Sequence, residues 1–312
     1  METKVIYRHL CENEGDKIPL FQQWWWMDAV CAGKKWDVAL AYDQQRVSAA
    51  LPYLVGSKCG LKYIIQPQLT QFCGPWYHYP DSFRSENQRL VFEQNAASEL
   101  IRQVDRIHPL LFQQNFSPAV TNWLPFYWEG FRQTTRYTYR INDISNPEAV
   151  FSNFNKNERQ RRILKLQPQT HISTLSPAEF ADFQSLCRKQ QHQRNLLPYP
   201  LVADLATRAS DREQGLLLGL RKNDDRQLIA AAFAPFDSNF AYFLIPAVLE
   251  PFRSEGAMET LVWHLIEQLS PKTRGFDFEG SMQQGIEHFY RSFGAIQTPY
   301  FCVSKCPIRA LI

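Results

Sequence analysis

The sequences FYWEGFRQTTRYTY, residues 126–139, and FYRSFGAIQTPYF, residues 289–301, share a series of features that decides how this chain is organised. Each begins with a Phe-Tyr pair, reaches a glycine within a few residues and continues through Gln-Thr to a tyrosine. A second pair of similar stretches lies upstream, at 36–55 and 216–236, where an apolar run, a polar turn and an apolar run with Ala-Ala follow one another. Self-similarity of this kind indicates a duplicated unit. The chain is therefore expected to contain two copies of one α/β module.

Length and composition are those of a two-domain globular protein. The chain has 312 residues, enough for two domains of roughly 150 residues each. The polar run INDISNP at 141–147 contains Asn-Pro, so we expect an N-terminal module over 1–143 and a C-terminal module over 144–312. Hydrophobic residues make up 45% and charged residues 21% of the chain, which excludes general disorder. Aromatic residues, at 14%, favour large packed cores or a groove lined with rings.

Charge and cysteine content restrict the partners and the compartment. The net charge of +3 is too small to indicate binding to DNA or another long polyanion, so any anion site must be local. The seven cysteines include no CxxC and no set at zinc spacing, which predicts free thiols in a reducing compartment and no metal. No signal peptide is recognisable, and no apolar run approaches the roughly 20 residues of a membrane span. We expect a cytoplasmic protein with no transmembrane segment.

Hydrophobic periodicity predicts an α/β fold, with both helices and strands in each module. In the first module the pattern predicts helices over 18–31 and 86–107 and strands over 36–43, 46–55 and 135–141. In the second module it predicts, in chain order, helices over 177–188 and 200–210, strands over 215–222, 226–236 and 240–248, a helix that includes 258–269, a strand over 275–280, a helix over 283–293 and a strand over 298–304.

Two clusters allow both a structural and a binding interpretation. The segment after the module boundary carries five cations, Lys156, Arg159, Arg161, Arg162 and Lys165. They form either a solvated helix face or a phosphate clamp, in which Arg161 and Arg162 would bind substrate through paired donors. The aromatic loop at 69–80 includes Trp76 and Tyr77, whose rings either cover a core or line a substrate cleft.

The segment PFRSEGAM, residues 251–258, has the outline of a phosphate site. It follows a predicted strand and opens a predicted helix, whose first turn leaves backbone N–H groups unpaired and attracts anions. The candidate cofactor-binding residues are Arg253, Ser254, Glu255, Gly256 and Ala257. In the simpler interpretation Ser254 caps the helix and Glu255 lies in its first turn.

These residues resemble the pyrophosphate loop of the GNAT N-acyltransferases. That family has Arg or Gln, two residues, Gly, one residue and then Gly or Ala after its fourth strand; Arg253 and Gly256 match, and Met258 departs from the last position. A later family motif, an aromatic residue or Leu followed by Tyr, three residues and Gly-Phe, is similar to FYRSFGA at 289–295. The resemblance implies acyl-CoA as co-substrate and Tyr290 as general acid.

Nearly the whole chain resembles the FemAB-like branch, which consists of two GNAT modules in tandem and includes enzymes that add amino acids to peptidoglycan precursors. The resemblance implies that each module is a mixed, mostly antiparallel sheet flanked by helices. The similar segments are TRYTYRI, the basic NERQRRILKL, FDFEGS and GIEHFYRSFGA. Typical peptidoglycan aminoacyltransferases have Phe-Lys where this chain has Phe289 and Tyr290, and many have a helical arm for which this sequence has no heptads. Both departures favour an acyl thioester over an aminoacyl-tRNA donor.

Acyl transfer to an amine needs three functions. The thioester oxygen needs a donor as it becomes negative, for which a main-chain N–H along 246–250 is the candidate. The departing thiolate needs a proton, which Tyr290 can supply. The amine needs a base, for which Glu279 is the candidate, acting through water, while Asp277 is equally compatible with a structural role. His264 and His288 are expected at the surface or in packing.

The sequence therefore predicts an N-acyltransferase that transfers an acyl group from acyl-CoA to an amine of a small molecule, an amino sugar or a peptide, such as a cell-envelope precursor. One alternative is aminoacyl transfer from tRNA to a peptidoglycan precursor, with the basic segment 156–165 on the acceptor stem. Another is a non-catalytic binding module on the same fold. The oligomeric state is left open.

Overall fold

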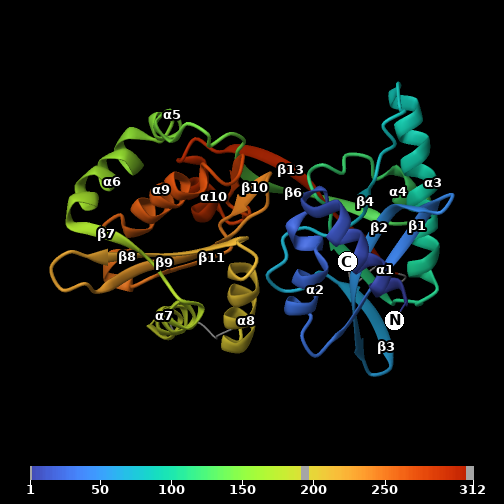
Figure 1. The fold of residues 1–312 in the computed structure, drawn as a ribbon, viewed down its shortest axis with the longest axis horizontal. Coiled ribbons are helices and arrows are strands. Elements are labelled where there is room, and N and C mark those ends of the chain that lie inside the picture. The colour runs from blue at the N-terminus through green and yellow to red at the C-terminus, as the bar shows by residue number, and fades with distance from the viewer. Residues whose placement is uncertain (1, 191–196, 307–312) are drawn as a thin grey trace. The chain divides into compact units, whose positions relative to one another are not determined.

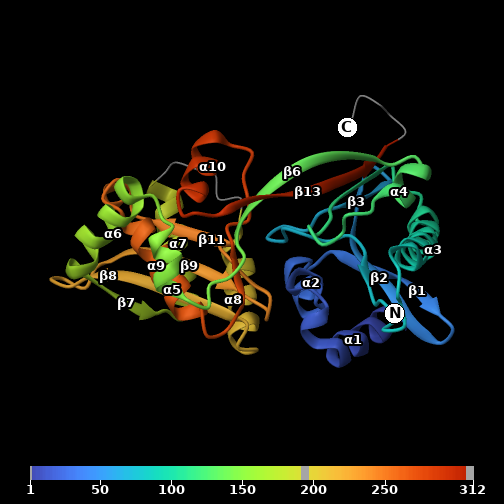
Figure 2. The ribbon, with the colours of Figure 1, turned by 90° about the horizontal axis from the view of Figure 1, so that it is seen from above.

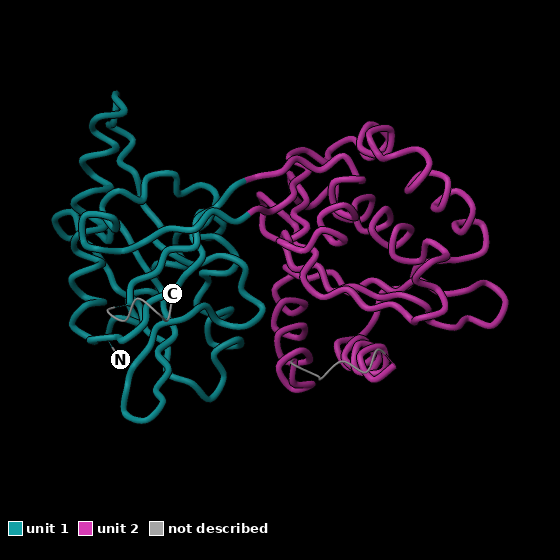
Figure 3. The backbone as a smooth tube through the Cα atoms, turned by 180° about the vertical axis from the view of Figure 1, so that it is seen from behind, with its two compact units in different colours: residues 1–136, 299–312 teal, residues 137–298 magenta. Residues whose placement is uncertain are grey.

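The computed structural model describes residues 2–190 and 197–306. The chain forms two compact units, which are residues 1–136 with 299–312 (unit 1) and residues 137–298 (unit 2), coloured separately in Figure 3. Each unit combines a sheet with flanking helices, which confirms the predicted α/β class (Figures 1 and 2). Among the described residues, no helix is long and apolar enough to cross a membrane.

Unit 1 is built on the strand order β1-β2-β3-β5-β13, and β4 pairs with β2. Its longest helix, α3, begins with a capping box at Ser85 and packs against β1 and β2. The helices are α1 (Glu2–Glu14), α2 (Trp24–Val30), α3 (Glu86–Asp105) and α4 (Leu124–Trp128). The strands are β1 (Lys35–Asp43), β2 (Arg46–Lys58), β3 (Leu61–Ile65), β4 (Trp76–Tyr77), β5 (Leu111–Asn115) and β6 (Arg132–Ile141), of which β6 ends in unit 2.

Unit 2 contains an antiparallel sheet of order β11-β9-β8-β7, with helix α9 contacting β8, β9 and β11 and helices α7 and α8 contacting the same sheet (Figure 1). The helices are α5 (Pro147–Ser152), α6 (Arg161–Leu166), α7 (Pro177–Gln190), α8 (Tyr199–Ser210), α9 (Ala257–Leu269) and α10 (Gln284–Arg291). The strands are β7 (Thr170–Thr174), β8 (Gly215–Lys222), β9 (Leu228–Pro235), β10 (Phe240–Tyr242), β11 (Ile245–Val248), β12 (Gly275–Asp277) and β13 (Ile296–Lys305), of which β13 ends in unit 1.

The two repeated Phe-Tyr segments occupy equivalent places. Each lies at a short helix, α4 or α10, and each is followed by a glycine in the left-handed region, Gly130 with φ 82° and Gly294 with φ 74°. A long strand follows, β6 or β13, and these strands exchange partners: β13 pairs with β5, and β6 pairs with β12. The compact units therefore differ from the modules 1–143 and 144–312 by an exchanged pair of strands.

The predicted strand 240–248 is split in two, which corrects the sequence prediction. Strand β10 pairs in parallel with β12, whereas β11 pairs antiparallel with β9 in the other sheet. Between them the Phe243 N–H donates to the Asp277 carbonyl and the Leu244 N–H donates to the Tyr242 carbonyl, which bends the chain. The two sheets separate at this bend, and the free edge of β11 borders the site described below.

The predicted helix 18–31 is also shorter than expected. It begins only at Trp24, because Pro19 starts a separate 3₁₀ turn at Leu20–Gln22 and Gln23 has an extended ψ of 140°. Helix α1 and strands β3, β5 and β7 were not predicted, since each is either short or strongly polar.

Candidate active site

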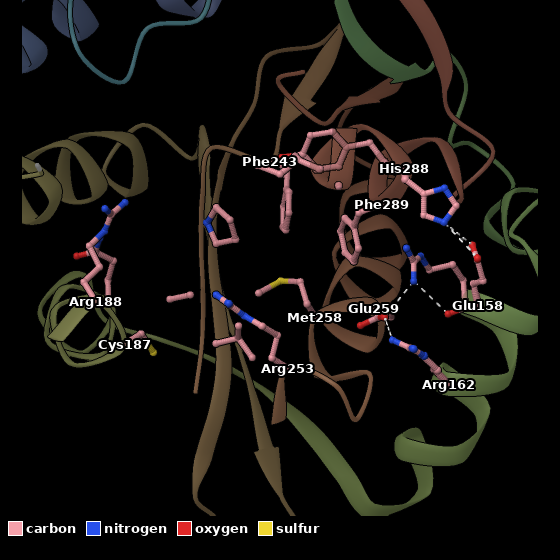
Figure 4. Close-up of a pocket in the computed structure, with 18 residues that line it drawn as sticks. Glu158, Arg162, Cys187, Arg188, Phe243, Arg253, Met258, Glu259, His288 and Phe289 are labelled. Carbon is pink, nitrogen blue, oxygen red and sulfur yellow. Dashed lines mark hydrogen bonds and ion pairs between the residues drawn. The ribbon is translucent and has the colours of Figure 1, made fainter. Parts of the chain in front are cut away.

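A pocket of about 700 Å³ lies in unit 2 among α7, β11, the start of α9 and α10 (Figure 4). All of its lining residues belong to unit 2. Four arginines and two glutamates line it, so the formal charge of the lining favours an anionic ligand. The charged lining residues are Glu158, Arg159, Arg162, Arg188, Arg253 and Glu259, and the apolar ones include Phe243, Pro246, Ala247, Val248, Met258, Ile286 and Phe289.

Strand β11 offers a backbone donor to this pocket. It is the edge strand of its sheet, with β9 on one side only. The Leu249 N–H donates to the Ile229 carbonyl of β9, and backbone groups alternate in direction along an antiparallel strand. Val248 therefore directs its N–H away from β9, toward the free edge, whereas Pro246 has no N–H. Among the main-chain N–H groups predicted as donors along 246–250, the N–H of Val248 therefore points in the direction that an oxyanion site needs.

The start of α9 depends on Gly256. This residue is the N-cap, with φ 95°, and a Cβ built on it would lie 2.9 Å from Arg162 Cβ, so only glycine fits. Ser254 is not the cap, which corrects the simpler interpretation of this segment. Arg253 lines the pocket, where its side chain is 54% exposed and lies 3.7 Å from Glu250. Figure 4 shows Met258 between Arg253 and Phe289.

The basic cluster divides into a buried part and an exposed part. Glu259, in the first turn of α9, is 2% exposed and accepts hydrogen bonds from Arg159 at 3.1 Å and Arg162 at 2.9 Å. Arg159 is itself buried and lies over the Phe289 ring at 4.5 Å. Arg161 is exposed and does not line the pocket. The arrangement could not be read from the sequence, because Glu259 is about a hundred residues from its partners.

Tyr290 and Phe289 reach the pocket from α10. The Tyr290 ring lies 5.0 Å from Phe278 and 6.3 Å from Tyr139, and burial raises the pKa of its phenol above the ordinary value. The phenol is thus protonated at neutral pH. A protonated phenol at the pocket can give a proton to a leaving thiolate.

The two carboxylates of the FDFEGS segment differ in role. Asp277 is fully buried and accepts hydrogen bonds from Thr138, from Arg140 at 2.7 Å and from the Glu279 N–H, so it holds β12 to β6. Glu279 has a left-handed φ of 63°, and its buried Oε1 has no hydrogen-bond partner among the described residues. Burial, and secondarily Asp277, raises the pKa of Glu279 well above 4.5. Burial, and secondarily the charge of Glu279, raises the pKa of Tyr290.

Helix α7 supplies a wall that the sequence did not predict. The buried Gln184 and Cys187 and the partly exposed Arg188 line the pocket from this helix. Burial raises the pKa of the Cys187 thiol to about 12, so this cysteine is protonated and is not a nucleophile at neutral pH. The sequence feature that could have indicated this wall is Gln184, a polar residue at a core-facing position of the helix between Phe183 and Cys187.

Several predicted residues lie elsewhere. Trp76 and Tyr77 are buried in unit 1, where the Trp76 indole donates to the Lys17 carbonyl at 2.8 Å, and neither lines the pocket. Their rings cover a core, which is the structural alternative stated above. The His264 Nδ1 lies 2.6 Å from the Glu267 carboxylate, which accepts its hydrogen bond, as expected for a packing role. His288 is exposed, as expected, and its side chain lies at the pocket, 3.1 Å from Glu158.

Residues 153–289, which include the pocket, match the family model of the GNAT acetyltransferase domain. No curated protein sequence matches the chain. Among solved structures, FemX has a TM-score of 0.69 at 11% identity, covering 96% of this chain and 94% of FemX. L-PGS from Bacillus licheniformis has a TM-score of 0.52 at 8% identity, covering 88% of this chain and 85% of that chain. A tandem GNAT protein from the clavulanic acid biosynthesis pathway has a TM-score of 0.50 at 10% identity, covering 88% and 83%. These likenesses confirm the predicted tandem GNAT fold.

Proposed function

The chain carries a GNAT acetyltransferase domain in a FemAB-like tandem fold, and from this premise we propose that it transfers an acyl group from acyl-CoA to an amine. The observation that supports the donor is the convergence of two elements on one pocket. The glycine-capped start of α9, with Arg253 beside it, offers N–H groups and charge to a pyrophosphate. The free edge of β11 offers an extended partner to the amide-containing arm of coenzyme A.

The residues then take the following parts in the transfer. The neutral amine attacks the thioester carbonyl carbon, and the Val248 N–H stabilises the oxygen that becomes negative. The carbon–sulfur bond breaks, and the thiolate takes a proton from Tyr290, so the products are an amide and free coenzyme A. Glu279, through water, accepts the proton that the amine loses. The two proton transfers balance when Glu279 releases its proton to solvent and the Tyr290 phenolate takes one up from solvent.

This proposal is tested with acetyl-CoA and a panel of small amines, amino sugars and peptides. Calorimetry measures whether acetyl-CoA binds, and a thiol-reactive dye measures whether coenzyme A is released in proportion to the amine added. Binding with amine-dependent release supports the proposal. Binding without release for any amine favours the non-catalytic module, and no binding removes the donor assignment.

One observation favours the aminoacyl-tRNA alternative. Lys156, Arg161 and Lys165 are exposed, and the structure assigns none of them an ion pair with a described residue. Cations on a surface can hold a nucleic-acid backbone, and such binding falls steeply with salt. Transfer from charged tRNA in the absence of any acyl-CoA turnover would establish this donor instead.

A further inference from the structure

We infer that the α7 wall of the pocket binds a carboxylate of the acceptor, so that the acceptor is an amino acid or a peptide with a free carboxyl group. This inference rests on the proposed function and adds the chemical class of its substrate. The wall consists of Gln184 and Arg188, one helical turn apart on α7 and both lining the pocket.

Gln184 carries the argument. Its side chain is only 2% exposed, yet its Nε2 group makes no hydrogen bond to the described protein, and it lines the pocket. Leaving a buried donor unpaired costs about 1–3 kcal/mol. An apolar residue would serve the core of α7 better at this position, where Phe180, Phe183 and Cys187 are its buried neighbours on the helix. A ligand that accepts a hydrogen bond from Nε2 accounts for the glutamine.

The positive charge of Arg188 indicates that this ligand is negatively charged. It makes no ion pair with any carboxylate in the described part of the chain, in contrast to Arg159 and Arg162, which share Glu259. Figure 4 shows Arg188 on the α7 side of the pocket, on the opposite side from Arg162 and Glu259. An arginine that has no carboxylate partner in the described part of the chain therefore lies one helical turn from Gln184. A guanidinium and an amide N–H together match the two oxygens of a carboxylate.

A phosphate of the acyl-CoA donor could accept the same hydrogen bonds as a carboxylate of the acceptor. The experiment therefore tests the two ligands separately. The side-chain amide signal of Gln184 is assigned by NMR from its loss in Gln184→Leu, and the full chain is titrated with L-alanyl-L-alanine. The C-terminal amide of that dipeptide, which keeps the amine and lacks the carboxylate, is the matched ligand. Coenzyme A is titrated separately.

We expect the dipeptide acid, and not its amide, to shift the Gln184 signal. Gln184→Leu and Arg188→Gln should each weaken binding of the acid about tenfold or more, as expected for loss of a charge-assisted hydrogen bond, while Lys189→Gln, an exposed neighbour on α7, should leave it unchanged. Gln184→Leu should also melt no lower than the parent, because it removes a buried unpaired donor; a lower melting temperature with unchanged affinity would show a structural role.

Three results would overturn the inference. The first is that the dipeptide acid does not shift the Gln184 signal, and the second is that the acid and its amide bind with equal affinity. The third is that coenzyme A shifts the Gln184 signal and that Arg188→Gln weakens binding of coenzyme A alone, which would assign the wall to the donor. Failure of the proposed function is a different result. If acetyl-CoA neither binds nor turns over while the dipeptide acid still binds through Gln184, the carboxylate site stands and the donor does not.

Discussion

At the residue scale, the chemistry depends on side chains whose burial changes their protonation. Burial raises the pKa of Tyr290, of Glu279 and of Cys187, and the consequence differs for each. The phenol and the thiol are neutral at physiological pH, so Tyr290 is a proton donor and Cys187 is inert. The carboxyl of Glu279 titrates above its ordinary range, which brings its strength as a base closer to what an amine substrate requires.

Replacing Tyr290 by Phe keeps the ring that contacts Phe278 and removes only the proton donor. We expect kcat to fall by about 10²–10⁴ while acetyl-CoA binding by calorimetry stays the same. Tyr127 occupies the equivalent position in the first repeat and is 58% exposed, so Tyr127→Phe is the matched control with no expected effect. Equal turnover by the Tyr290 variant and the parent would remove this residue from the mechanism.

Glu279 makes stability depend on pH. Its pKa in the folded chain is raised above 4.5, so the folded state holds the proton more tightly than the unfolded state does. This contribution to the free energy of unfolding is complete below the unfolded pKa of about 4.3 and is lost as pH rises through the raised folded pKa. Gln cannot ionise, so Glu279→Gln should gain stability relative to the parent across that interval. Urea unfolding of both proteins over a pH series measures the difference, and parallel curves would show that Glu279 is solvated.

At the scale of elements, the start of α9 serves two purposes. Its Gly256 cap allows Arg162 to approach, and its first turn contains Glu259, which joins α9 to the preceding basic segment. Met258 and Glu259 of the same turn line the pocket. A helix start that is held by buried ion pairs is rigid, which suits the binding of a pyrophosphate.

Arg253→Ala tests the binding role of this element. The arginine is half-exposed and weakly paired, so its loss should affect the ligand more than the fold. We expect acetyl-CoA binding to weaken by about 1–3 kcal/mol, the range for a hydrogen bond to a charged group. Calorimetry gives the affinity, and Lys272→Ala, an exposed cation beyond the other end of α9, is the control. Unchanged affinity would leave Arg253 as a helix-end residue.

Two arginines of the basic segment should differ in how much they contribute to the free energy of unfolding. Arg159→Gln leaves the buried Glu259 carboxylate with Arg162 as its remaining partner and should cost about 1.5–3 kcal/mol, the range for a hydrogen bond to a charged group. Arg161→Gln changes an exposed side chain and should stay within about 0.5 kcal/mol. Thermal and urea unfolding measure both, and similar values for the two variants would contradict the division of this cluster into buried and exposed parts.

At the scale of the whole molecule, the exchanged strands join β13, at Ile296–Lys305, to the core of unit 1. Val303, on β13, is fully buried in the core that contains Leu51 and Phe112 of unit 1. Val303→Ala should lower the free energy of unfolding by about 2 kcal/mol through lost burial and the cavity left behind. Hydrogen exchange should then speed up in β5 and β2 rather than in β8 and β9. Loss of protection confined to unit 2 would show that β13 stabilises the other unit.

The sequence by itself determined the features that depend on local signals. The repeated Phe-Tyr segments, the β1–β2 and β8–β9 hairpins, the start of α9 with Arg253 and Gly256, and the placement of Tyr290 on a helix follow from periodicity and turn residues within about twenty positions. These signals were strong because a helix start or a hairpin is specified by its own residues.

Only the tertiary structure decided which distant segments meet. The exchange of β6 and β13, the pairing of β10 with β12 and of β11 with β9, and the pairing of Glu259 with Arg159 each join residues that are not neighbours in the chain. The unpaired state of the Gln184 side chain likewise depends on everything that surrounds it. A strand carries the same hydrophobic pattern whichever partner it pairs with, and a polar side chain gives no local sign of whether its partner is the protein or a ligand. Those choices are made by the packing of the complete chain, where burial leaves each polar group either paired or exposed to a ligand.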